Sequence, residues 1–149
     1  MKNYLLILSV LILAISCGNS KRAQKKAMKN NQPVVLTNDF VSYARLNADV
    51  NIVNASIIDS TLTLNVSFNG GCEKHSFELI GSKMIQKSMP PIRNIMLIHH
   101  SNNDSCRELV EQELKFNISE FQYPGSVIML ALKGWDTKLR YVTKTVEKL

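Results

Sequence analysis

The chain has 149 residues, of which 45% are hydrophobic, so it is long enough for one domain with a packed core and short for two. Its formal net charge is +6. Six basic residues ahead of Pro33 account for this excess: Lys2, Lys21, Arg22, Lys25, Lys26 and Lys29. The other basic residues equal the 12 acidic residues in number. The domain after Pro33 is therefore neutral, which argues against a nucleic-acid partner.

The first 16 residues are predicted to be a lipoprotein signal peptide. A short basic start is followed by an apolar run over 4–15, which is too short to cross a bilayer core that needs about 20 residues. The run ends Leu-Ala-Ile-Ser-Cys, which resembles a bacterial lipobox with Cys17 as the acylated residue. That resemblance implies cleavage before Cys17, a diacylglyceryl thioether on its sulfur and usually an N-acyl chain such as palmitate. The alternatives are an ordinary signal peptide and an uncleaved anchor.

Residues 17–33 are predicted to be the acylated cysteine and a flexible basic tether, because they contain five basic residues, no acid and few groups to bury. Several acyl chains hold a protein firmly on a membrane without spanning it. The sequence therefore predicts a cell-envelope protein, anchored through Cys17 on the outer membrane or the periplasmic face. Disulfides form in such a compartment.

The remaining residues, 34–149, are predicted to form one all-β domain. Runs of β-branched and aromatic residues alternate with turn residues, most clearly over 62–68, where Leu62, Leu64, Val66 and Phe68 share one face. Strands are expected at 34–36, 40–43, 50–58, 62–68, 75–79, 95–98, 110–118, 126–132 and 139–143. We expect a loop over 84–91, a polar turn over 99–105 and at most one helical turn over 105–108. This pattern favours an antiparallel β-sandwich, immunoglobulin-like or related, with about seven or eight short strands. A small β-barrel is the alternative.

Cys72 and Cys106 both follow predicted strands and turns, so the loops that carry them can meet. With Cys17 acylated, they are the two cysteines left to pair in an oxidising compartment. A disulfide between them would close a loop of about 35 residues and contribute roughly 4 kcal/mol in the chain-entropy model.

Two other interpretations of this region remain open. Cys72, His75, His99 and Cys106 are a candidate zinc or copper shell, with Asp104 as a nearby oxygen donor. An envelope hydrolase would instead use His75, Asp104 and a glutamate. No GxSxG elbow and no phosphate-binding glycine loop accompany these residues. A non-enzyme without a cofactor is therefore the main prediction.

The segments GGCEKHSFEL and HHSNNDSC, followed by LKFNISEF, resemble those of a group of small uncharacterised lipoproteins from Bacteroidota-type bacteria. The similarity covers roughly residues 62–121. It implies a lipid-anchored, β-rich domain with cysteines at Cys72 and Cys106, and it implies no activity. Our functional prediction is a non-catalytic binding or structural module. Its expected partners are the membrane, reached through the lipid on Cys17, and an envelope protein or glycan. Trp135, in a predicted hairpin loop, is the candidate contact for that partner.

Overall fold

The computed structural model describes residues 31–43, 48–124 and 127–143. The predicted signal peptide, Cys17 and residues 17–30 of the predicted tether lie outside this described part. Among the described residues, no helix has the length and apolar character needed to cross a membrane.

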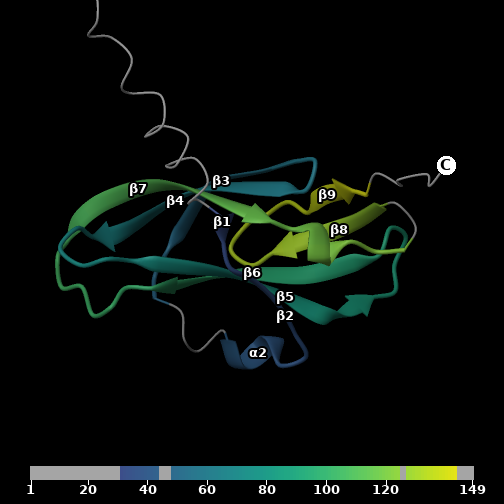
Figure 1. The fold of residues 1–149 in the computed structure, drawn as a ribbon, viewed down its shortest axis with the longest axis horizontal. Helices are drawn as coiled ribbons and strands as arrows, with labels where there is room; N and C mark the ends of the chain where they lie inside the picture. Colours follow the sequence, from purple (N-terminus) through teal and green to yellow (C-terminus); the bar gives the residue numbers. More distant parts are fainter. Residues whose placement is uncertain (1–30, 44–47, 125–126, 144–149) are drawn as a thin grey trace, which may run out of the picture.

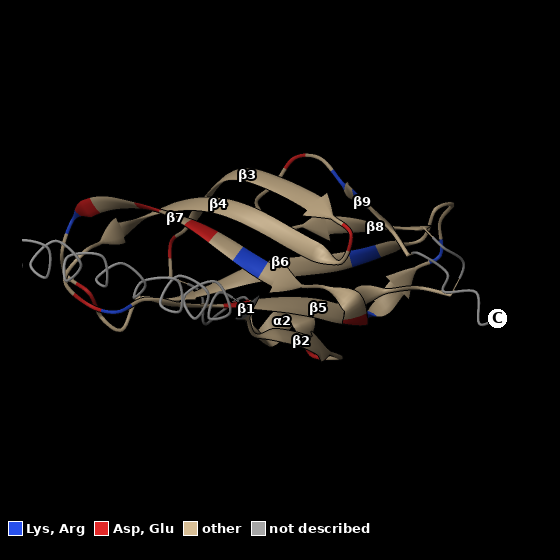
Figure 2. Ribbon diagram, turned by 45° about the horizontal axis from the view of Figure 1, so that its top comes forward, with Lys and Arg blue, Asp and Glu red and all other residues tan. Residues whose placement is uncertain are grey.

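The described residues form two β-sheets that face each other, as the sandwich prediction requires (Figure 1 and Figure 2). One sheet has four strands in the order β1-β7-β4-β3, and the other has five in the order β2-β5-β6-β8-β9. The strands are β1 (Asn31–Gln32), β2 (Val34–Thr37), β3 (Asn51–Ile58), β4 (Thr61–Gly70), β5 (Ser76–Gln86), β6 (Ile92–His100), β7 (Glu108–Asn117), β8 (Val127–Leu132) and β9 (Leu139–Val142). Within the described ranges the sheets do not close into the alternative barrel.

The core lies between the two sheets and is filled from both. The predicted alternation of β4 is confirmed, because Leu62, Leu64, Val66 and Phe68 are all buried. They pack against apolar side chains of β5, β6, β7 and β8 in one continuous cluster. Burial of each such side chain contributes about 1.5–3 kcal/mol relative to exposure, so this cluster is the main source of stability.

The N-terminal strand belongs to both sheets. Asn31 and Gln32 pair in parallel with β7, and Val34 to Thr37 pair in parallel with β5. Pro33 lies between these two pairings; it has no N–H to donate, and its carbonyl oxygen accepts the N–H of Leu79. β6 and β8 form a third parallel pair, because β7 crosses the sandwich between them. The sandwich is therefore mixed, whereas the sequence pattern indicated antiparallel pairing.

The strand predicted over 40–43 is wrong, because Phe40–Tyr43 forms the short helix α2. Phe40 and Tyr43 are three residues apart, so one helical turn places both side chains on the same face. They pack on Ile80, Met96 and Ile98, on the outer side of the five-stranded sheet. Figure 1 shows α2 beside β2 and β5.

Three further predictions need correction. β5 continues to Gln86 through a shift in register, so the predicted loop is shorter. His99 and His100 end β6, where His99 pairs with Phe77, rather than starting a turn. No helical turn forms over 105–108; Glu108 instead begins β7, opposite Gly70 of β4. The strand predicted at 34–36 is confirmed at β2, which lies at the edge of its sheet.

Candidate functional site

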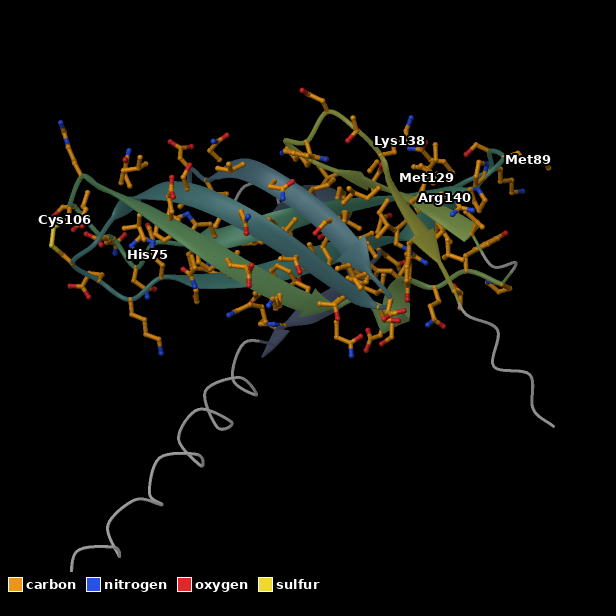
Figure 3. All side chains as sticks on the ribbon, turned by 90° about the horizontal axis from the view of Figure 1, so that it is seen from above. His75, Met89, Cys106, Met129, Lys138 and Arg140 are labelled. Carbon is orange, nitrogen blue, oxygen red and sulfur yellow. A yellow bond between two sulfur atoms is a disulfide. The ribbon has the colours of Figure 1, made fainter. Side chains whose placement is uncertain are left out.

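The Cys72 and Cys106 loops meet at one end of the sandwich, where Figure 3 shows Cys106 and His75. A disulfide joins the two cysteines, whose α-carbons lie 5.9 Å apart. This separation is near the usual value for a disulfide, so the two loops carry the bridge in an ordinary arrangement. The bridge holds the turn after β4 to the loop between β6 and β7.

Asp104 is the central acceptor of this end of the fold. Its Oδ2 accepts the backbone N–H groups of Cys72 and Glu73, each at 2.9 Å, and its Oδ1 accepts the N–H of Cys106 at 2.8 Å. Together with a bond from His75, these donors hold the pKa of Asp104 well below its usual range, the Glu73 and Cys106 N–H groups first. The carboxylate is therefore charged and fixed between the two halves of the disulfide.

A row of hydrogen-bonding contacts leads from Asp104 into the core. Nε2 of His75 lies 3.1 Å from Oδ2 of Asp104, and Nδ1 of His75 lies 2.7 Å from Nε2 of His99. Nδ1 of His99 lies 3.0 Å from the backbone oxygen of Asp49. The backbone oxygen of His99 also accepts the N–H of Ala48 at 3.0 Å. The row thus joins the disulfide loops to the segment that enters β3.

The number of hydrogens available limits what this row can do. The Asp104 carboxylate and the Asp49 carbonyl, at its two ends, only accept hydrogen bonds, and each neutral imidazole carries one N–H. Three contacts in a row need three hydrogens, and two neutral rings provide two. One more proton on the histidine pair would complete the row. Burial opposes it, because removing His99 from water lowers its pKa.

Aromatic rings enclose the histidine pair. His99 stacks on Phe77 with ring centroids 4.8 Å apart, and Phe68 contacts both imidazoles at 4.6 and 4.8 Å. Only 6% of the His75 side chain and none of the Asp104 side chain is exposed, and His99 is 1% exposed. Solvent and solutes therefore have little access to these groups.

This arrangement leaves few atoms free for chemistry. Both ring nitrogens of His75 and both of His99 already have partners, and the two sulfurs are bonded to each other. The shell of Cys72, His75, His99 and Cys106 considered for zinc or copper is therefore not formed here, since metal binding needs thiolates and ring lone pairs. Sulfurs and a carboxylate oxygen of Cys72, Cys106 and Asp104 do lie within 4.8 Å of one another.

The structure provides only part of the arrangement that the hydrolase interpretation needs. The structure brings His75 and Asp104 together, as an acid–base pair would require. Of the two candidate glutamates, Glu73 donates its backbone N–H to Asp104, whereas Glu78 lies on the outer side of the sheet, with Oε1 4.0 Å from Nε2 of His100. The two adjacent histidines thus point to opposite faces of β6, as strand alternation predicts.

Trp135 lies in the β8–β9 hairpin, as predicted, and is partly buried against the core rather than fully displayed. Two other contributors to the histidine site could not be predicted from the sequence. The Asp49 oxygen is a backbone atom, and Phe68 was predicted only as a core residue. The Gly70–Gly71 pair is the one sequence feature that indicates close packing here, because the backbone of Gly70 lies directly against the ring of His75.

The fold and this site define a β-sandwich of two mixed sheets with one end fixed by a disulfide and a buried His–His–Asp row. Searches against protein-family models and curated proteins find no match. Solved structures with the same fold include a NigD-like immunity protein from Bacteroides caccae, with a TM-score of 0.53 and 19% identity over 74% of this chain and 58% of that chain.

Two other crystal structures are similar to the same degree. A protein of unknown function from Bacteroides vulgatus has a TM-score of 0.53 and 16% identity over 78% of this chain and 58% of its own. A protein described as toxin-related from Parabacteroides distasonis has a TM-score of 0.53 and 17% identity over 76% and 62%. The chain therefore spans about six-tenths of the length of these proteins, and at such identity the likeness concerns the fold.

Proposed function

We propose that this chain is a lipid-anchored protein of the bacterial envelope whose sandwich is a non-catalytic binding or structural module. The lipobox-like ending at Cys17, the basic segment after it and the resemblance to Bacteroidota-type lipoproteins support the anchor. The partners in this proposal are the membrane, through the lipid, and an envelope protein or glycan.

The use of all four imidazole nitrogens inside the fold carries the non-catalytic part of the proposal. A general base needs a free lone pair within reach of a substrate proton. In this structure the ring nitrogens of His75 and His99 face each other, Asp104 and the Asp49 backbone oxygen, behind a disulfide and the packed rings of Phe68 and Phe77. The residues best suited to chemistry are thus committed to holding three chain segments together.

The fold comparisons also support a binding role. The Bacteroides caccae protein of the same fold is a NigD-like immunity protein. Applied to this chain as part of the proposal, that description favours an envelope protein over a glycan as the partner of the sandwich.

Lipid labelling tests the anchor. The full chain, expressed in a bacterial host that processes lipoproteins, should incorporate a palmitate analogue and sediment with membranes. Cys17→Ser should lose both properties. A matched variant, Cys72→Ser with Cys106→Ser, should keep the label, because those sulfurs pair with each other. Equal labelling of the Cys17→Ser variant would reject the anchor.

Thiol accessibility tests the non-catalytic part. The native, unreduced protein from the envelope should not react with a thiol reagent, and both cysteines should react after denaturation and reduction. Stoichiometric labelling of one cysteine in the native protein would reveal a free thiol and contradict the proposed module.

A further inference from the structure

A cavity of about 380 Å³ lies far from the disulfide end. Figure 3 places Lys138, one of its lining residues, toward the opposite end of the sandwich from Cys106. Its walls come from α2, β6, β8 and the β8–β9 hairpin. Its volume falls within the roughly 300–1,000 Å³ that is usual for small-molecule sites.

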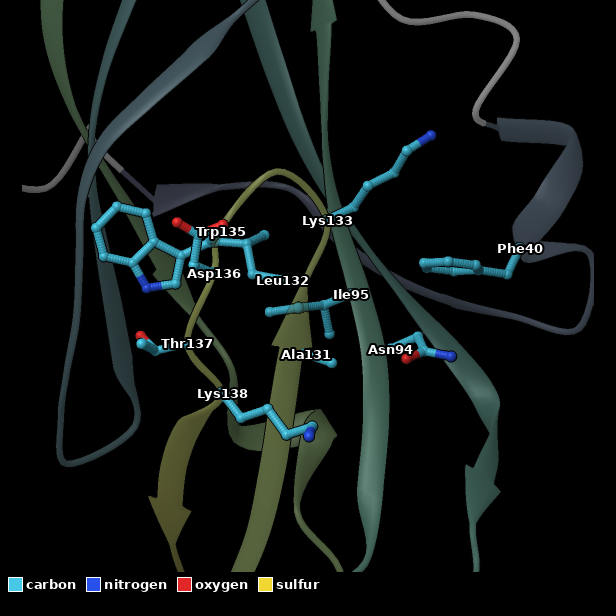
Figure 4. A pocket seen from close by; sticks show the side chains of 10 residues that line it. All are labelled: Phe40, Asn94, Ile95, Ala131, Leu132, Lys133, Trp135, Asp136, Thr137 and Lys138. Atoms are coloured by element: carbon cyan, nitrogen blue, oxygen red, sulfur yellow. The ribbon is translucent and has the colours of Figure 1, made fainter.

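The floor and one wall of this cavity are apolar. Ala131 is partly exposed at the floor, whereas Ile95 and Leu132 support it from the core and are themselves 0% and 3% exposed. Figure 4 shows the ring of Phe40 directed toward the cavity from α2, across from the hairpin that carries Trp135. These surfaces suit the apolar body of a ligand, since burying apolar area yields about 25 cal/mol per Å².

The polar groups at the rim are mainly cationic. Lys133 and Lys138 line the cavity and are exposed, and within the described ranges neither ammonium forms an ion pair. Asp136 is the single acid of the lining and lies beside Trp135 in Figure 4. The side chain of Lys138 extends toward Asn94, whose amide adds hydrogen-bonding groups at the same rim.

We propose that this cavity binds a small organic carboxylate with an aromatic or branched apolar body. The body would lie on the floor beside Phe40, and the carboxylate would meet the ammonium group of Lys138 near Asn94. Lys133, whose side chain extends away at the other end of the cavity in Figure 4, would add a second positive charge at the rim. Charge-assisted hydrogen bonds of this kind are roughly twice as strong as neutral ones. The proposal rests on the proposed function only in giving the sandwich a binding role, and it is independent of the anchor and of the protein partner.

Trp135 provides a direct signal, because it lines the cavity and is the one tryptophan in the sequence. The full chain is titrated with phenylacetate, and separately with phenylacetamide, its neutral analogue. Phenylacetate should change the tryptophan fluorescence to saturation. Phenylacetamide should bind at least about tenfold more weakly, since it offers no charge to the two ammonium groups. Equal affinities, or no saturation with either compound, would overturn the proposal.

Variants locate the binding. Lys133→Gln with Lys138→Gln should weaken phenylacetate binding about tenfold and leave phenylacetamide unchanged. Lys74→Gln with Lys83→Gln removes two exposed lysines outside the cavity lining and should change neither affinity. Ala131→Trp should fill the floor and abolish the binding of both compounds, as followed by calorimetry. An equal loss in the two double lysine variants would show nonspecific charge attraction and reject the site. A failed titration would leave lipid labelling and thiol protection unaffected, so the two proposals fail separately.

Discussion

The carboxylate of Asp104 lies 3.1 Å from Nε2 of His75 while it accepts backbone N–H groups from both cysteines of the disulfide. One side chain therefore joins the covalent link at the surface to the stacked rings of the core. Breaking this relationship should affect both.

Asp104→Asn should destabilise the fold and flatten its response to acid. An amide accepts less strongly than a carboxylate and has one oxygen, so three N–H groups and His75 cannot all keep their acceptor. The pKa of Asp104 is lowered in the folded state, so its contribution is present above its unfolded pKa and is lost as the pH falls through its folded value. Urea unfolding across acidic pH should show a smaller loss for the variant. Asp136→Asn, in the hairpin loop, should behave like the wild type.

Mild acid should already weaken the fold through His99. Burial lowers its pKa, so between the unfolded value of about 6.5 and the folded value the unfolded chain binds more protons. Stability should therefore fall as the pH drops below about 6.5, before Asp104 titrates. His99→Phe, which keeps a ring beside Phe77, should remove this step from unfolding curves measured against pH. His100→Gln, whose ring lies outside the row, should retain it. A wild-type slope in His99→Phe would exclude His99 as the source.

Sequence pattern was sufficient for the parts of the fold that depend on local alternation. Leu62 to Phe68 alternate strictly, and the strand and its buried face follow directly. The sequence pattern did not predict the helix at 40–43, because four residues are too few to show the hydrophobic repeat of a helix. Its signals are local: Ser42 Oγ donates to Asp39 Oδ1 at 2.6 Å, and the N–H of Asp39 bonds to Thr37 Oγ1 at 3.0 Å.

The residues that form the site could be predicted from the sequence, but the contacts between them could not. Two cysteines at strand ends in an oxidising compartment indicate a disulfide, and the structure contains it. Whether His75 and His99 face a metal or each other depends on the register of β5 against β6, which pairs Phe77 with His99. Register is a long-range property that the spacing of residues along one segment does not fix. The parallel pairings of β1, β2 and β8 are long-range in the same way.

Removing the disulfide should lower the unfolding free energy by about 4 kcal/mol, because Cys72 and Cys106 are 34 positions apart and the open chain gains loop entropy when unfolded. The double variant Cys72→Ala with Cys106→Ala should show this loss in urea unfolding. Reductant should produce a similar loss in the wild type and none in the variant. A wild type indifferent to reductant would mean that the bridge is absent or contributes nothing.

Zinc and copper should not bind the oxidised protein. In the oxidised protein the sulfurs are joined and the imidazole nitrogens of His75 and His99 face protein atoms, so elemental analysis after oxidative expression should find no stoichiometric zinc or copper. Reduced protein frees Cys72 and Cys106 beside Asp104, and any zinc uptake there should disappear in the Cys72→Ala, Cys106→Ala variant. Stoichiometric metal in the oxidised protein would restore the metal-binding interpretation.

Gly70 provides a test of the histidine row that leaves every member of the row in place. A Cβ at this position would lie 2.4 Å from Nε2 and 2.6 Å from Cε1 of His75, so Gly70→Ala should push that ring away from Asp104. Overpacking of this kind costs about 1–3 kcal/mol. Gly134→Ala is a matched control, because φ is +83° there and the variant is strained, yet the nearest atom to its Cβ is Ile52 Cδ1 at 3.9 Å.

Both glycine variants should therefore lose stability, and one of them should also change the histidines. The chain has three histidines, so their imidazole signals can be followed individually by NMR against pH. In Gly70→Ala the signals of His75 and His99 should shift and the titration of His99 should change, because His99 loses its aligned partner, while the His100 signal should stay as in the wild type. In Gly134→Ala all three should match the wild type. If Gly70→Ala left all three unchanged, His75 would not be held against Asp104 and His99 as the structure describes.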